Sequence, residues 1–279
     1  MNMPLVDTHL HLWERSKFDY SWITSGSELD ADFTPEVIAP AIEEAGVTSA
    51  VLVQVGDFLE DSMHMLSLAE HWPFIAGVVG WIPLDEPDPA RALLDIYQLG
   101  GYLKGIRCLS HDYADVTWMV RESVQGGIRL LEPAGLTLDL VCVTERHLAN
   151  AGEIARLHPE LKIVIDHLAK PDIAHDEWEP WASQIRDVAE CDNVYIKLSG
   201  LNTASRPGAW SASDWQPYVN HTLECFTPAR MMLGSDWPVA SVDGDYVGVW
   251  KAQLETIAHL SLDEQKLIEA ETATSFYDL

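Results

Sequence analysis

The chain has 279 residues, of which 47% are hydrophobic and 22% are charged, enough apolar material for one large domain or two small ones. Its net charge of −27 at pH 7 argues against nucleic acid as a partner, because phosphate binding requires basic patches. No apolar run is long enough to span a bilayer, and no basic segment followed by an apolar one marks the N-terminus. We therefore expect a cytoplasmic protein that does not bind membranes, and the four widely spaced cysteines are predicted to be free thiols.

The first predicted strand, 5–11, lies in the stretch VDTHLHLW and contains two histidines, His9 and His11. Because side chains alternate between the two faces of a strand, these two rings point the same way. The segment 13–33 that follows is non-helical and rich in aromatic residues, so it could cover a binding site. An HxH pair can also arise by chance, and its meaning depends on what surrounds it.

The next segment shows the building unit of the chain. Thr34 is a plausible N-cap, Pro35 suits the first helical position, and Gly46 is placed to end the helix. The run SAVLVQV (49–55) that follows is apolar on both faces, as expected for a parallel strand that is buried on both sides. The sequence therefore predicts a helix followed by a core strand.

This unit recurs along the whole chain. Strands are predicted at 5–11, 49–55, 74–82, 102–108, 136–142, 162–168, 193–199 and 230–236. Helical patterns include 88–100, 144–158, 178–190, 215–226 and a final stretch at 260–279. Eight alternations over this length predict a (β/α)8 TIM barrel formed by one domain, 1–279, with an extra C-terminal helix. An open doubly wound sheet is the alternative, disfavoured because no GxGxxG follows the first strand.

The eighth predicted strand ends in Asp236. In a closed barrel it lies against the first strand, and active sites lie at the C-terminal ends of the strands. Asp236 is therefore expected beside His9 and His11. This arrangement places the two rings where barrel enzymes carry out their chemistry.

Other predicted strands also end in polar residues. Arg107 ends the fourth strand, His167 ends the sixth, and Lys197 and Asn202 belong to the end of the seventh. We predict that these side chains face a substrate. Alternatives stay open: Arg107 could lie on the surface, His167 could be a core histidine, and Lys197 could fill the barrel as one partner of a buried ion pair.

Three tryptophans, Trp13, Trp22 and Trp237, lie near these strand ends. They could form flat apolar walls for a ring-shaped substrate. They could equally belong to the core, and the sequence leaves both interpretations open.

The stretches DTHLHLW, KGIR, VIDHLAKP, YIKLSGL and LGSDWPV, in that order, resemble the amidohydrolase superfamily. They look most like its lactonase-rich branch, which includes sugar-lactone hydrolases related to L-fuconolactonase and L-rhamnonolactonase. The resemblance covers essentially the whole chain. It implies a distorted (β/α)8 barrel that hydrolyses a cyclic ester.

Carried over residue by residue, the resemblance assigns the family HxH to His9 and His11, the strand-4 arginine to Arg107, the strand-6 histidine to His167 and the strand-8 aspartate to Asp236. The stretch LTLDLVC lacks the strand-5 histidine of many metal-dependent members, and the lysine of YLKGIRC does not share the face of the arginine. A binuclear metal site is therefore not expected. The resemblance implies either no metal or one divalent ion, most plausibly zinc, on the two HxH histidines and the aspartate.

These assignments define a function. Asp236 is predicted to be the general base for water, while Arg107 and His167 polarise the carbonyl of a lactone. A metal-dependent decarboxylase of the same superfamily is one alternative, disfavoured by the missing strand-5 histidine. A non-catalytic ligand-binding barrel is another, disfavoured because binding alone does not require a base. The sequence determines neither the lactone nor the oligomeric state, and a homo-oligomer is compatible with it.

Overall fold

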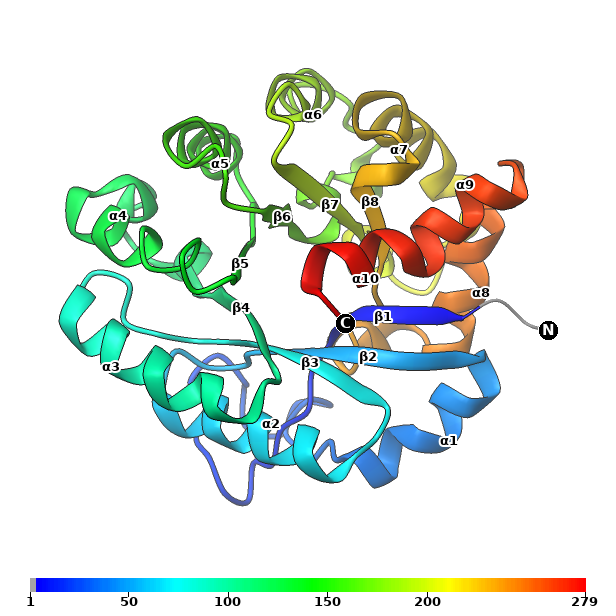
Figure 1. Ribbon diagram of the computed structural model, residues 1–279. Coiled ribbons are helices and arrows are strands. Elements are labelled where there is room, and N and C mark those ends of the chain that lie inside the picture. The colour runs from blue at the N-terminus through cyan, green and yellow to red at the C-terminus, as the bar shows by residue number, and fades with distance from the viewer. Residues whose placement is uncertain (1–3) are drawn as a thin grey trace.

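The computed structural model describes residues 4–279. The first three residues, which belong to the expected domain 1–279 and to the N-terminal segment considered above, lie outside the described residues. Eight parallel strands follow one another in the order β1 to β8, with helices between them on the outside (Figure 1). The sheet closes where Asp236 N donates to His9 O and His11 N donates to Trp237 O, each over 2.8 Å. The predicted (β/α)8 barrel is thus confirmed, and the open sheet is not formed.

The strands are β1 (Leu5–Leu10), β2 (Val47–Val53), β3 (Ile75–Gly80), β4 (Leu103–Arg107), β5 (Thr137–Leu140), β6 (Ile163–Ile165), β7 (Val194–Leu198) and β8 (Met231–Leu233). The helices that alternate with them are α1 (Pro35–Ala45), α2 (Leu59–His71), α3 (Pro87–Tyr97), α4 (Glu122–Ile128), α5 (Glu145–Leu157), α6 (Trp181–Ala189), α7 (Ala212–Phe226) and α8 (Tyr246–Ile257). Within the described residues, none of the helices is long and apolar enough to cross a membrane.

The strands β6 and β8 are shorter than the sequence predicts. After β6, the backbone turns into the left-handed region at His167, and after β8 it does so at Asp236. A residue with positive φ cannot continue a strand, so each strand ends before its functional side chain. The side chains of His167 and Asp236 therefore do not follow the alternation between the two faces of a strand.

The C-terminal stretch forms two short helices, α9 (Leu262–Lys266) and α10 (Thr272–Tyr277), joined by the π-helical turn Leu267–Glu271. Figure 1 shows α10 across the middle of the barrel beside β1 and β8. Phe276 and Tyr277 pack against barrel residues that include Val6 and Val79. The predicted C-terminal helix is therefore present and runs without interruption from Leu262 to Tyr277, with a π-helical turn in its middle.

Candidate active site

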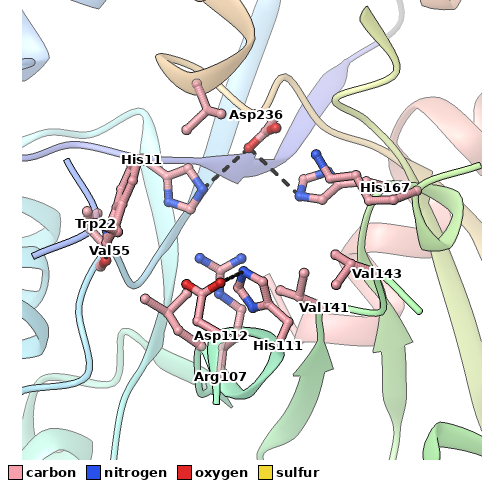
Figure 2. Close-up of a pocket in the computed structure, with 13 residues that line it drawn as sticks. His11, Trp22, Val55, Arg107, His111, Asp112, Val141, Val143, His167 and Asp236 are labelled. Atoms are coloured by element: carbon pink, nitrogen blue, oxygen red, sulfur yellow. Dashed lines mark hydrogen bonds and ion pairs between the residues drawn. The ribbon is translucent and has the colours of Figure 1, made fainter. Parts of the chain in front are cut away.

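A cavity of about 340 Å³ opens at the C-terminal ends of the strands. His11, Arg107, His167 and Asp236 line it together with Trp22 and a set of apolar residues: Val55, Leu109, Val141, Val143 and Val239. In Figure 2, Asp236 lies between His11 and His167, with Arg107 across the pocket. The cavity is within the size range of small-molecule sites, and two histidines of its lining, His11 and His167, lie 3.5 Å and 3.8 Å from Asp236 Oδ1.

The two histidines of β1 and the loop after it present one nitrogen each toward Asp236. His11 Nδ1 lies 2.8 Å from Val53 O, so it carries the hydrogen and leaves Nε2 with a lone pair. His11 Nε2 lies 3.1 Å from His9 Nε2 and 3.5 Å from Asp236 Oδ1. His9 Nε2 lies 3.8 Å from the same carboxylate oxygen. Three potential ligand atoms therefore converge, as the period-two spacing predicted.

Asp236 sits in a backbone conformation that few residues adopt. Its φ is 59°, and its Oδ2 is buried without a hydrogen-bond partner among the described residues. A Cβ on Gly200 would approach that oxygen to 2.6 Å, so the carboxylate needs glycine at that position. Burial raises the pKa of Asp236, but nearby His167, His11 and the Lys170 ammonium outweigh it and hold the pKa below the usual range. The group is therefore an ionised carboxylate, as a general base requires, and one of its oxygens has no hydrogen-bond partner among the described residues.

His167 begins a run of four consecutive non-glycine residues with positive φ, from His167 to Lys170. Left-handed backbone costs an L-residue roughly 1–2 kcal/mol, so this turn is a strained element at the edge of the pocket. It places His167 and Lys170, three residues apart, in the same cavity lining. Two hydrogen bonds hold it: Lys170 N donates to His167 O over 2.8 Å, and Trp181 Nε1 donates to Leu168 O over 2.7 Å.

His167 is a neutral imidazole at pH 7, because burial lowers its pKa to about 3. Its Nδ1 lies 2.8 Å from Ser199 Oγ, and its Nε2 lies 3.8 Å from Asp236 Oδ1. When Ser199 donates to Nδ1, the ring hydrogen is on Nε2 and faces the pocket. The ring can then donate a hydrogen bond to a substrate.

Arg107 ends β4 and is almost completely buried. It donates to Gln54 O over 2.6 Å and to Asp166 Oδ2 over 3.1 Å, and its NH1 lies 3.3 Å from His9 Nε2. The guanidinium is therefore fixed in the pocket wall, and the surface position that the sequence left open is not the one it occupies.

Lys197, predicted to contact substrate, lies below the pocket and does not line it. It is fully buried, 2.6 Å from Asp139 Oδ2 and 3.1 Å from Asp166 Oδ1. Burial raises the pKa of Asp166, yet Lys197 and His9 outweigh it and hold the pKa below its ordinary value. The structure thus gives Lys197 the alternative role of a buried partner that supports the residues above it.

His9, also predicted to contact substrate, is fully buried and does not line the cavity either. Three further predicted substrate contacts, Trp13, Trp237 and Asn202, lie outside the cavity lining as well. Trp13 is fully buried; its Nε1 donates to Ala31 O, and its ring packs on Phe33. Trp237 packs against the same phenylalanine. Asn202 donates to Ala240 O over 2.6 Å and so ties together two loops. Packing and backbone hydrogen bonds occupy these side chains, which leaves Trp22 as the tryptophan that borders the pocket.

The structure adds three polar pocket residues that the sequence interpretation did not assign: His111, Asp112 and Lys170. His111 follows β4, and burial lowers its pKa to about 4, so it is neutral at pH 7. Lys170 belongs to the stretch HLAKP and was visible in the sequence. Its direction depends on the left-handed turn, and no periodicity signals such a turn.

The residues present fit one divalent cation. If His9 Nδ1 donates to Asp166 Oδ1, 3.2 Å away, two Nε2 lone pairs face each other over 3.1 Å with no hydrogen between them. A shared cation would relieve this repulsion, and the free Oδ2 of Asp236 offers further coordination. His9, His11 and Asp236 form one candidate ligand set; a second combines His9 with Asp166 and His167. The β5 segment contributes Val141 to the pocket in place of a histidine ligand.

Comparison with known proteins identifies the family of this chain. The family profile described as Amidohydrolase matches residues 6–279, and the chain therefore belongs to the amidohydrolase family of enzymes. Among its relatives is an L-fucono-1,5-lactonase of Burkholderia ambifaria, 34% identical over 90% of this chain and 86% of the relative. An L-fucono-1,5-lactonase of Burkholderia multivorans is 31% identical over 86% of this chain and 84% of that protein.

Solved structures show the same fold. A Burkholderia multivorans amidohydrolase with bound zinc superposes with a TM-score of 0.90 at 29% identity, over 99% of both chains. A 5-carboxyvanillate decarboxylase from Sphingomonas paucimobilis superposes with a TM-score of 0.65 at 14% identity, over the full length of both chains. The second likeness concerns the fold alone.

Proposed function

We propose that this protein hydrolyses a sugar lactone to the corresponding hydroxy acid. The observation that carries the proposal is the buried Asp236 carboxylate, which lines a pocket together with His167 and Arg107 and whose Oδ2 has no hydrogen-bond partner among the described residues. The two Burkholderia lactonases, similar over most of their length, support the reaction class. The decarboxylase alternative is supported only by the shared fold.

In the proposed reaction, Asp236 accepts a proton from water as the water oxygen attacks the lactone carbonyl carbon. Charge develops on the carbonyl oxygen, and donors fixed in advance stabilise it. His167 Nε2 and the Arg107 guanidinium supply those donors. The ring C–O bond then breaks, and Asp236 returns its proton to the leaving alkoxide, which yields a hydroxy acid.

We further propose that His9, His11 and Asp236 can hold one divalent ion, with zinc as the candidate because a similar amidohydrolase binds it. When bound, such an ion would act as a Lewis acid toward the carbonyl oxygen. The missing strand-5 histidine supports one ion rather than two.

The pocket lining supports a small ring as substrate. Five aliphatic side chains and Trp22 provide apolar surface, while Lys170, His111 and Asp112 offer polar groups for hydroxyls or a carbonyl. This mixture fits a ring that has one apolar face and several hydroxyl groups.

The test is a panel of six- and five-membered sugar lactones and one non-sugar lactone, followed by acid release with a pH indicator, with and without a chelator. We expect turnover of a sugar lactone and its loss in Asp236→Asn. Turnover of none of the lactones, together with carbon dioxide release from an aromatic carboxylate, would replace the proposal with the decarboxylase. Zinc content before and after chelation decides whether the ion is needed.

A further inference from the structure

A chain of buried hydrogen bonds and ion pairs connects the C-terminal end of the protein with the candidate active site. Tyr277 Oη donates to Asp139 Oδ2 over 2.7 Å. The same carboxylate oxygen accepts from Lys197 Nζ over 2.6 Å. Lys197 Nζ in turn lies 3.1 Å from Asp166 Oδ1 and 3.2 Å from His9 Nδ1. The chain of contacts runs through the barrel interior, from the helix that closes one end to the histidine at the other.

All five groups are buried: Asp139, Asp166, Lys197 and His9 are fully inaccessible, and Tyr277 is 2% exposed. Burying charges costs free energy unless each is paired and hydrogen-bonded, and apolar packing of α10 alone would not require a hydroxyl here. A phenylalanine at position 277 would fill the same space as the tyrosine ring, and the neighbouring Phe276 shows that this cluster accepts a phenylalanine. The tyrosine hydroxyl is therefore best explained by what it binds.

His9 Nδ1 is contested by two neighbours with opposite demands. Asp166 Oδ1, 3.2 Å away, is a carboxylate oxygen that can only accept, so it favours a hydrogen on Nδ1 and the lone pair on Nε2, toward His11 and Asp236. Lys197 Nζ can only donate, which would move the ring hydrogen to Nε2. The position of the Lys197 ammonium therefore decides which of the two ring nitrogens of His9 carries the hydrogen.

Tyr277 and Lys197 bind the same oxygen of Asp139, so together they fix the rotation of that carboxylate and the position of the ammonium. We propose that Tyr277 is a positioning residue that acts through Asp139, Lys197 and Asp166 to hold the His9 ring in the tautomer that has its Nε2 lone pair facing His11 and Asp236. The inference builds on the proposed function of the site. Its test needs no substrate, so it can fail or succeed independently of lactone turnover.

The test is Tyr277→Phe, which removes one hydroxyl and keeps the ring. Histidine-selective 15N labelling with long-range 15N–1H NMR distinguishes the two tautomers, and the His9 signals are assigned by their loss in His9→Gln. We expect wild-type His9 to show one tautomer with hydrogen on Nδ1 in the metal-free protein. Tyr277→Phe should show a mixture of both tautomers.

The second readout is zinc affinity by calorimetry. Groups that support a metal ligand from behind commonly change affinity by about 10–100-fold, and Tyr277 acts from further away, so a loss of roughly 3–10-fold is expected. Asp139→Asn removes the shared carboxylate charge and should disturb the His9 signals more strongly. It also keeps the test decisive if Tyr277→Phe does not fold.

Tyr20→Phe is the matched control. Tyr20 is buried and donates to the buried Asp61 over 2.9 Å, the same kind of bond at a place without contact to His9. It should lower stability comparably and leave the His9 signals unchanged. Unchanged His9 signals and zinc affinity in Tyr277→Phe, with only a stability loss like that of Tyr20→Phe, would overturn the proposal.

Discussion

At the end of the barrel where the strands finish, the fully buried His9 presents polar atoms to His11 and Asp236, which line the pocket. At the opposite end, Phe276 packs among buried apolar residues such as Val6 and Val79. The first end carries strained backbone, including four successive left-handed residues. The second has the dense apolar contacts that stabilise a fold.

The difference suggests a division of labour. Strain and buried charge at the catalytic end reduce stability, and apolar packing at the closed end offsets the loss. Substitutions at the two ends should therefore separate activity from stability, and the predictions below go from the largest expected effect to the smallest.

Asp236→Asn should remove the proposed general base at the pocket and leave the fold intact. The amide keeps the shape of the carboxylate but cannot act as a base, and general-base contributions run to roughly 10²–10⁴-fold. We expect kcat on the best lactone to fall by that factor, with KM changed little. Circular dichroism should show a native barrel. A variant that retains near wild-type turnover would place the base elsewhere, and His167 would be tested next.

Phe276→Ala should weaken the apolar packing at the closed end of the barrel and so lower the stability of the fold. Deleting a buried aromatic ring costs about 3–5 kcal/mol through lost burial and a residual cavity. Urea unfolding should show a loss of this size, with the pocket residues still in place. The control is Trp22→Ala at the pocket, where the side chain is 36% exposed and the stability loss should be clearly smaller. Equal losses at both positions would contradict the division of labour.

The pH dependence of stability sharpens the comparison at the catalytic end. Burial lowers the pKa of His167 from 6.5 to about 3, so between these values the unfolded chain binds a proton that the folded chain does not. Stability of the metal-free protein should therefore fall as pH falls below 6.5, at up to about 1.4 kcal/mol per pH unit from this group.

Urea unfolding from pH 7.5 to 5 measures this slope. His167→Gln has no group that titrates there, so its stability should fall less steeply with acid, whatever its stability at pH 7. Parallel slopes for the two proteins would show that His167 is readily protonated in the fold.

The smallest effect concerns the left-handed turn. Ala169 has a φ of 59°, which costs alanine roughly 1–2 kcal/mol but glycine little. Glycine also gains entropy in the unfolded chain, worth about 0.4–1 kcal/mol. Ala169→Gly should thus be neutral or slightly stabilising. Ala155→Gly, inside helix α5, should instead cost about 1 kcal/mol or more. Thermal unfolding of the pair checks the difference, and equal destabilisation would argue against strain in the turn.

The sequence by itself determined the barrel and the centre of the site. Alternation of buried strands and amphipathic helices left few other folds, and parallel strands bring their carboxyl ends to one edge. His9, His11, Arg107, His167 and Asp236 could therefore be placed together from their positions alone, and the structure brings them together.

The tertiary structure alone decided the directions and partners of the rest. Period-two alternation is lost where a strand ends, so the left-handed turn that directs Lys170 into the pocket left no pattern in the sequence. From the sequence, Lys197 could face the substrate or belong to a buried ion pair. The structure places it beside Asp139 and Asp166, and it forms ion pairs with both. Tyr277 contacts Asp139 across 138 positions of the chain. A contact at that separation follows from how the terminal segment packs into the closed barrel, because no local propensity encodes which distant carboxylate a hydroxyl will meet.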